Sequence, residues 1–154
     1  MLAKYHSEAI LHQQVADYLR LQYPDVPFRT DYAAGLKMTM GQAAKQKRLQ
    51  GGRKAWPDLF IAHPSTLRDH VRTADGSISY LPNAGARVDF HGLFIELKRE
   101  GERLKKRNGE WATEHITEQA KTLDNLRDNG YMAEFAVGFD EAKKIIDEYL
   151  GGAK

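Results

Sequence analysis

The chain has 154 residues, of which 42% are hydrophobic and 29% charged, and its formal net charge is +2. This size and composition are typical of one globular domain with a proper core, not of a disordered chain. The lack of cysteine excludes disulfides, thiolate zinc sites and cysteine nucleophiles. No apolar run approaches the ~20 residues of a membrane span, and the N-terminus lacks the core of a signal peptide. We therefore expect an intracellular, cytoplasmic protein without a membrane partner.

Hydrophobic periodicity and capping residues predict eight elements in the order helix, strand, helix, strand, strand, helix, strand, helix. The predicted helices cover residues 7–22, 39–50 and 117–129, and a last stretch that Asp140 caps. The predicted strands cover residues 26–32, 59–62, 93–98 and 131–139. The strand–helix–strand unit at 93–139 is typical of a partly parallel sheet covered by helices, so the predicted fold class is α/β with a mixed sheet.

The strand at 93–98 carries two charges at the end of a very apolar run. Because side chains alternate across a strand, Glu96 and Lys98 share one face with Phe94, and the aliphatic residues share the other. Burying a carboxylate and an ammonium costs free energy unless both are paired or bind something. An exposed Glu–Lys pair at a strand end explains the hexapeptide equally well.

Asp58 follows Trp56-Pro57 and stands at the mouth of the predicted strand 59–62. If this strand is a neighbour of 93–98, Asp58 and Glu96 converge, and one of them is protonated near neutral pH unless a cation lies between them. Hard oxygen ligands without cysteine suit Mg²⁺ or Mn²⁺. The alternative is an ordinary Pro-Asp turn.

Two polar side chains share apolar faces of predicted helices. Glu8 lies on the inward face of the first helix with Leu11 and Val15, where a carboxylate needs a partner. The alternative is a first-turn acid favoured by the helix dipole. Gln119 shares a face with Leu123, and its alternative is a first-turn polar residue without function.

The six histidines show no tight ligand spacing such as His-x-x-x-His. We interpret most of them as surface or packing residues. His115, near Gln119, is a lesser candidate for proton transfer.

Basic residues concentrate in two stretches. Residues 37–54 hold six basic residues and no acid, and residues 98–107 hold six basic residues and two acids. Such stretches suit a polyanion, although solvated surface loops have the same composition. The residues expected to contact nucleic acid are Lys45, Lys47, Arg48, Arg53, Lys54, Arg99, Lys105 and Lys106.

The order Pro-Asp, then Glu-x-Lys on an apolar strand, then a glutamine-led helix resembles the PD-(D/E)XK nuclease superfamily. Over nearly the whole chain it resembles specifically the VRR-NUC branch. The segments that carry the likeness are Pro57-Asp58, Glu96-Leu97-Lys98-Arg99, Thr117-Glu118-Gln119, Gly130-Tyr131 and Glu134-Phe135-Ala136-Val137. The resemblance implies a restriction-endonuclease-like core, with residues 1–154 forming a single VRR-NUC-like domain.

The resemblance also implies roles for individual residues. Asp58 and Glu96 match the family's metal-binding carboxylates, and the carbonyl of Leu97 matches a further ligand. Lys98 matches the lysine that orients or helps deprotonate the attacking water. Two further matches complete the expected catalytic set, Gln119 and Glu8.

The gap between Asp58 and Glu96 is long for a simple hairpin, and residues 63–90 therefore read as an insertion. Turn-forming residues indicate a small hairpin around Asp75-Gly76. The insertion either reaches over the substrate or extends the hairpin. Its basic side chains are candidates for phosphate contacts, namely His63, Arg68, His70 and Arg72.

Family members hydrolyse phosphodiester bonds in DNA with a divalent metal, which implies Mg²⁺ or Mn²⁺ here. Stand-alone viral and bacterial members are similar to dimeric enzymes that act on branched DNA. We therefore expect a homodimeric, structure-selective endonuclease, bacterial or phage-encoded, that acts on DNA such as four-way junctions in repair and recombination. The alternative is a DNA-binding module that keeps the fold without cleavage. A purely structural domain would leave the inward-facing charges unexplained.

Overall fold

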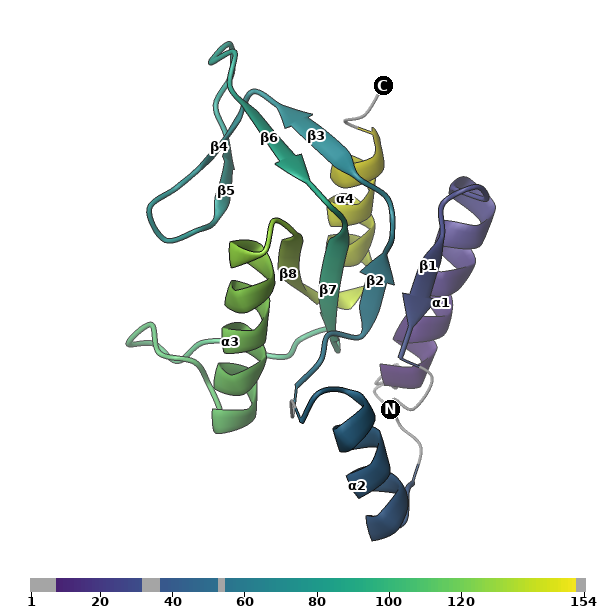
Figure 1. The fold of residues 1–154 in the computed structure, drawn as a ribbon. Coiled ribbons are helices and arrows are strands. Elements are labelled where there is room, and N and C mark those ends of the chain that lie inside the picture. The colour runs from purple at the N-terminus through teal and green to yellow at the C-terminus, as the bar shows by residue number, and fades with distance from the viewer. Residues whose placement is uncertain (1–7, 32–36, 53–54, 152–154) are drawn as a thin grey trace, which may run out of the picture.

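The computed structural model describes residues 8–31, 37–52 and 55–151 (Figure 1). The helices are α1 (Glu8–Gln22), α2 (Met40–Leu49), α3 (Glu114–Asp128) and α4 (Gly138–Gly151). The strands are β1 (Phe28–Thr30), β2 (Leu59–Ile61), β3 (Ser65–Arg68), β4 (His70–Arg72), β5 (Ile78–Tyr80), β6 (Arg87–Phe90), β7 (Leu93–Lys98) and β8 (Met132–Val137). None of these helices combines the length and apolar composition that a bilayer span requires.

A four-stranded sheet in the order β1-β2-β7-β8 forms the centre of the molecule. β2 pairs antiparallel with β1 and with β7, whereas β7 pairs parallel with β8 through the crossover helix α3. The sheet is therefore mixed, and helices lie on both of its faces (Figure 1). This confirms the predicted α/β class and the strand–helix–strand unit.

The central strand β7 is buried along its whole length. Leu93, Ile95 and Leu97 belong to the larger core, which α1 and α4 cover. Phe94 faces the other way into a smaller core with Leu123 of α3. Each fully buried aliphatic or aromatic side chain contributes roughly 1.5–3 kcal/mol, so this alternation fixes which face of β7 each helix covers. Glu96 and Lys98 consequently lie on the α3 side.

Residues 63–90 form two further pairs of strands. β3 pairs antiparallel with β6, and β4 pairs with β5 around the predicted turn at Asp75-Gly76. Because β2 runs from Leu59 to Ile61, this insertion leaves the sheet at the end opposite Asp58 (Figure 1). The insertion thus extends the β2–β7 hairpin and does not reach over the carboxylates. Contact of its basic side chains with phosphate stays a prediction.

Several element boundaries differ from the predicted ones. α3 begins at Glu114 behind a Thr113 N-cap, before the predicted residue 117. α4 begins at Gly138, whose φ of 81° breaks β8, so Asp140 lies in the first turn and not at the cap. β1 is shorter than the predicted strand 26–32. Two predicted boundary residues lie outside the described residues, Ser7 and Tyr32.

The predicted basic helix at 39–50 is confirmed as α2. Thr39 forms a capping box with Gln42, which satisfies two backbone donors at the start of the helix. No residue of α2 is buried, so tertiary packing contributes little to this helix. It lies near the end of the sheet where Asp58 stands (Figure 1).

Candidate active site

The strand register brings the two central carboxylates together. Leu59 of β2 is opposite Ile95 of β7, and the next pair in that register is Asp58 with Glu96. Asp58 Oδ2 accepts a hydrogen bond from the backbone N–H of Leu97 at 2.9 Å. Both acids are buried, with 7% of Asp58 and 4% of Glu96 exposed. Asp58 and Glu96 therefore converge, as predicted if their strands are neighbours.

Glu96, Lys98 and Gln119 form a cluster between β7 and α3. Gln119 Nε2 donates a hydrogen bond to Glu96 Oε1, so the helix that follows the central strand holds this carboxylate. Lys98 Nζ lies 3.7 Å from the same oxygen and 4.0 Å from Glu102. All three members of the cluster are buried. The cluster is thus paired internally, not exposed at a strand end.

Burial changes the protonation of the carboxylate pair. Desolvation, together with the charge of Asp58, raises the pKa of Glu96 to about 9, and Lys98 opposes this rise. Burial likewise raises the pKa of Asp58 above its usual range, against the lowering effects of His12 and the Leu97 amide. Two acids in one dry pocket repel each other when both are ionised. Without a cation, the pair therefore retains a proton near neutral pH.

The N-terminal part of α1 adds two side chains to this site. Glu8, His12 and Asp58 each present one ligand atom, and these atoms lie within 4.8 Å of one another. His12 Nε2 is 3.7 Å from Asp58 Oδ1 and makes no hydrogen bond. The interpretation of most histidines as surface or packing residues did not single out His12, which lies in this group. The available signal was its spacing of four residues from Glu8, which puts both side chains on one face of the helix.

Contacts at the other end of α1 fasten this helix to α4. The hydroxyls of Tyr18 and Tyr23 both donate to Asp147 Oδ1, at 2.6 and 2.7 Å, and Lys143 Nζ is 2.8 Å from Asp147 Oδ2. The apolar residues of α1 pack into the larger core between these contacts and Glu8. Two independent anchors thus set the direction in which the N-terminal part of α1 points.

The donor set fits a divalent cation. A buried imidazole nitrogen without a partner and two carboxyls with raised pKa values all gain from a nearby positive charge. Oxygen ligands suit Mg²⁺ and Mn²⁺, and imidazole suits first-row transition ions. Asp58 is common to both groups, since Oδ1 faces His12 and Oδ2 faces β7. The residues that would hold metal are Glu8, His12, Asp58 and Glu96, while the Leu97 carbonyl stays a predicted ligand.

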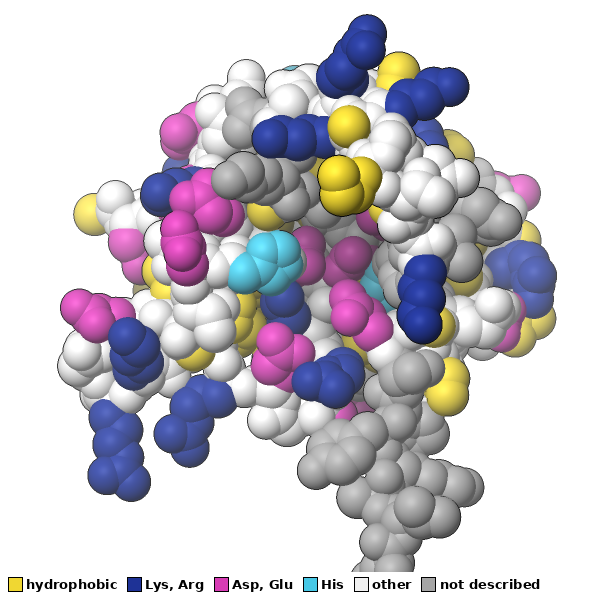
Figure 2. All heavy atoms as spheres, turned by 90° about the horizontal axis from the view of Figure 1, so that it is seen from below, with side chains coloured by type: hydrophobic (Ala, Val, Ile, Leu, Met, Phe, Trp, Pro, Cys, Tyr) yellow, Lys and Arg dark blue, Asp and Glu magenta, His cyan; other side chains and the backbone are white. Residues whose placement is uncertain are grey.

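The basic residues stand around this end of the sheet. Exposed lysine and arginine residues belong to α2 and to the loop between β7 and α3. Both segments lie near this end of the sheet (Figure 1). Lys105 is held over the Trp111 ring at 4.7 Å from its centroid. Viewed from this end, acidic and histidine side chains gather about a central hollow with basic side chains around it (Figure 2). Two of the expected nucleic-acid contacts, Arg53 and Lys54, lie outside the described residues.

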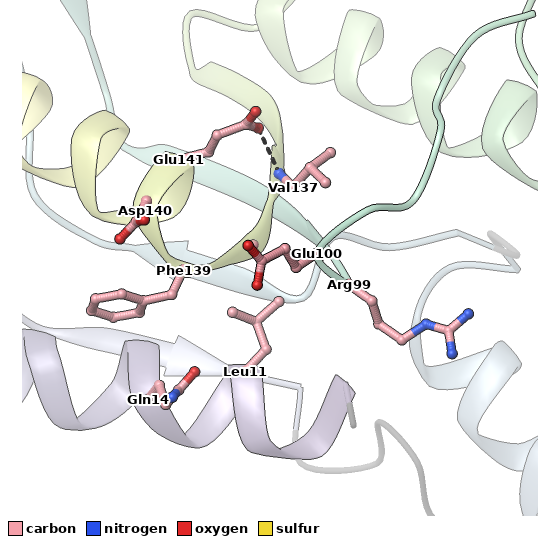
Figure 3. Close-up of a pocket in the computed structure, with 9 residues that line it drawn as sticks. Leu11, Gln14, Arg99, Glu100, Val137, Phe139, Asp140 and Glu141 are labelled. Atoms are coloured by element: carbon pink, nitrogen blue, oxygen red, sulfur yellow. Dashed lines mark hydrogen bonds between the residues drawn. The ribbon is translucent and has the colours of Figure 1, made fainter. Parts of the chain in front are cut away.

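A cleft of about 240 Å³ lies beside the site, between α1 and the start of α4 (Figure 3). Leu11 and Gln14 line it from α1, and Glu100 lines it from the segment after β7. Glu141 accepts a hydrogen bond from the Val137 amide at 2.7 Å and so closes the turn from β8 into α4. The cleft carries more acid than base, which makes it a poor place for a phosphate.

The fold agrees with a known structure. A protein described as "VRR_NUC domain protein" superposes with a TM-score of 0.50 and 22% sequence identity, over 94% of this chain and 91% of that chain. No family model and no curated protein matches the sequence. At this identity the likeness shows the fold, which is the mixed α/β architecture of a VRR-NUC domain. The fold expected from the sequence resemblance is confirmed.

Proposed function

We propose that this protein is a metal-dependent nuclease that hydrolyses phosphodiester bonds in DNA at Asp58, Glu96 and Lys98. One observation carries the proposal: two buried carboxylates and an ammonium meet where adjacent strands of a VRR-NUC fold begin and end. Burying these charged side chains costs free energy that their mutual pairing repays only in part. Perturbed carboxyls of this kind concentrate at functional sites.

The chain's own side chains have distinct tasks in this proposal. Asp58 and Glu96 would hold a divalent cation, which when bound would supply polarisation of the phosphate oxygens and a water of lowered pKa. Lys98, 3.7 Å from Glu96, is placed to orient the attacking water and to stabilise negative charge that develops on the phosphate. Gln119 holds Glu96 in position through its amide. Asp58 is held by the Leu97 amide in the same way.

The basic residues around the site supply DNA binding. α2 carries Lys45, Lys47 and Arg48 and no acid, and the loop after β7 carries Arg99, Lys105 and Lys106. Such side chains bind the phosphate backbone without reading bases, and their binding weakens as salt rises. Selectivity then comes from DNA shape. We therefore extend the proposal to branched DNA such as four-way junctions, cut by a homodimer that presents two sites.

The test is incubation of the protein with labelled duplex, single-stranded, flap and four-way-junction DNA in Mg²⁺, in Mn²⁺ and in EDTA. We expect metal-dependent cleavage that Asp58→Asn and Glu96→Gln each abolish and that Lys98→Met lowers by about 10²–10³, while DNA binding persists. Glu148→Gln, an exposed acid on α4, is the matched control and should cut normally.

Full activity of all three site variants refutes the assignment. DNA binding without cleavage in either metal would instead establish the binding-module alternative. Light scattering tests the dimer.

A further inference from the structure

The imidazole of His12 is buried, and among the residues that the structure describes Nε2 has no hydrogen-bond partner. Only 8% of the residue is exposed, and it lies among the core residues of α1. Asp58 Oδ1 lies 3.7 Å from this nitrogen, which is too long for a hydrogen bond. A buried polar nitrogen in this state costs free energy unless something else binds it.

The geometry around Nε2 is that of an incomplete ligand set. Glu8 and His12 are one helical turn apart on α1, and Asp58 comes from the start of β2. The three ligand atoms lie within 4.8 Å of one another, close enough to contact one cation. Asp58 turns Oδ2 away to the Leu97 amide, which leaves Oδ1 for this group. Two rigid elements thus present two oxygens and one nitrogen toward a common point.

We propose that His12 is a metal ligand through Nε2, in a site formed with Glu8 and Asp58, and that it makes the protein prefer Mn²⁺ over Mg²⁺. Mg²⁺ takes hard oxygen ligands and tolerates imidazole poorly, whereas nitrogen ligands raise affinity along the first transition series. The inference rests on the proposed function only in placing Asp58 at a metal centre. Metal binding at this site is measurable without any cleavage.

A different explanation makes a different prediction. If His12 serves only as a positive partner for Asp58, its removal changes the stability of the metal-free protein. It then leaves both metal affinities in the same ratio. A ligand role instead changes the ratio of the Mn²⁺ affinity to the Mg²⁺ affinity. The ratio, and not activity, is therefore the quantity to measure.

The experiment uses the full chain and three variants, His12→Gln, Glu8→Gln and His70→Gln. Calorimetry gives affinities for Mn²⁺ and Mg²⁺, and pulsed electron paramagnetic resonance of bound Mn²⁺ reports directly bound nitrogen. We expect a nitrogen signal in the unaltered protein that His12→Gln removes, with Mn²⁺ affinity falling at least about tenfold. His70, in the β4–β5 hairpin beyond the far end of the sheet, is the matched control and should change neither quantity.

If His12→Gln fails to fold, Glu8→Gln still tests the metal site. Glu8 is exposed, so its substitution leaves the core intact, and it should weaken both metals while the nitrogen signal stays. Absence of a nitrogen signal in the unaltered protein, or an unchanged affinity ratio in folded His12→Gln, overturns the inference. Nitrogen-bound Mn²⁺ without DNA cleavage would contradict only the proposed function. Cleavage with an unchanged ratio would contradict only the role of His12.

Discussion

Asp58 accepts a hydrogen bond from the backbone amide of Leu97 at 2.9 Å, which fastens the carboxylate at the start of β2 to the strand that carries Glu96. This bond joins residues that the 63–90 insertion separates in the sequence. It fixes one oxygen of Asp58 against β7 and leaves the other toward α1. The arrangement makes the site sensitive to any change in the pairing of β2 with β7.

The raised pKa of Glu96 predicts how stability depends on pH without metal. Its folded-state pKa of about 9 lies above the ordinary value of 4.5, so the folded protein binds the extra proton. This group's contribution to the free energy of unfolding is therefore complete below about pH 4.5 and is lost as pH rises toward 9. Glu96→Gln should remove this loss of stability at high pH. Thermal unfolding in EDTA at pH 8 should show a melting temperature about 5 °C higher for the variant.

Comparison at several pH values provides the control. At pH 5 Glu96 is protonated in the folded protein, so the two proteins should unfold at similar temperatures. The difference between their melting temperatures should grow as pH increases. Parallel curves from pH 5 to pH 9 would show that Glu96 is ionised throughout this range.

Lys98→Met should separate catalysis from binding. The variant keeps the aliphatic length of the buried side chain but removes the ammonium beside Glu96. Loss of one group that stabilises transition-state charge costs about 10²–10³ in rate, so we expect a fall of this size in single-turnover cleavage. DNA affinity, measured by anisotropy, should change little. Lys121→Met, an exposed lysine on α3, is the control, and equal losses in both variants would contradict a specific role for Lys98.

Charge reversal on α2 should weaken DNA binding without unfolding the protein. Lys45, Lys47 and Arg48 are exposed on a helix that buries no residue, so their triple replacement by glutamate leaves the core unchanged. Each lost phosphate contact lowers the salt slope of binding by about 0.9, and three contacts should lower it by roughly 2–3. The measurement is DNA affinity against salt concentration, with cleavage at saturating DNA unchanged.

The insertion supplies a control of equal charge for the α2 variant. Arg68, Arg72 and Arg87 are exposed on strands that extend from the other end of the sheet. Their replacement by glutamate should leave the salt slope as it was. If both triple variants lose binding equally, α2 is not the specific contact.

The contact between α1 and α4 should affect both stability and metal affinity. Tyr23→Phe removes one of the two hydroxyls that Asp147 accepts from, and the net loss of one such bond is about 1 kcal/mol in urea unfolding. Asp147→Ala leaves both hydroxyls and Lys143 without their partner, and we expect a loss of about 2–3 kcal/mol. Since α1 carries Glu8 and His12, metal affinity should fall as well. A stability loss with unchanged metal affinity would show that core packing alone orients α1.

Local features of the fold and site follow from the sequence by itself. The alternation in residues 93–98 places Glu96 and Lys98 on one face, because the period of a strand is two. Thr39 marks the start of α2, since its side chain caps the helix within three residues. Gln119 lies on the inward face of α3 through helical spacing from Leu123. Each of these depends on contacts between residues close in the chain.

Tertiary structure alone decided the rest. Asp58 meets Glu96 because β2 and β7 pair antiparallel in one register, and a shift of one residue would turn each side chain to the opposite face. His12 joins them only because α1 packs on the sheet at the angle that its core residues and Asp147 impose. These contacts join segments that are distant in the sequence, so local sequence patterns do not predict them.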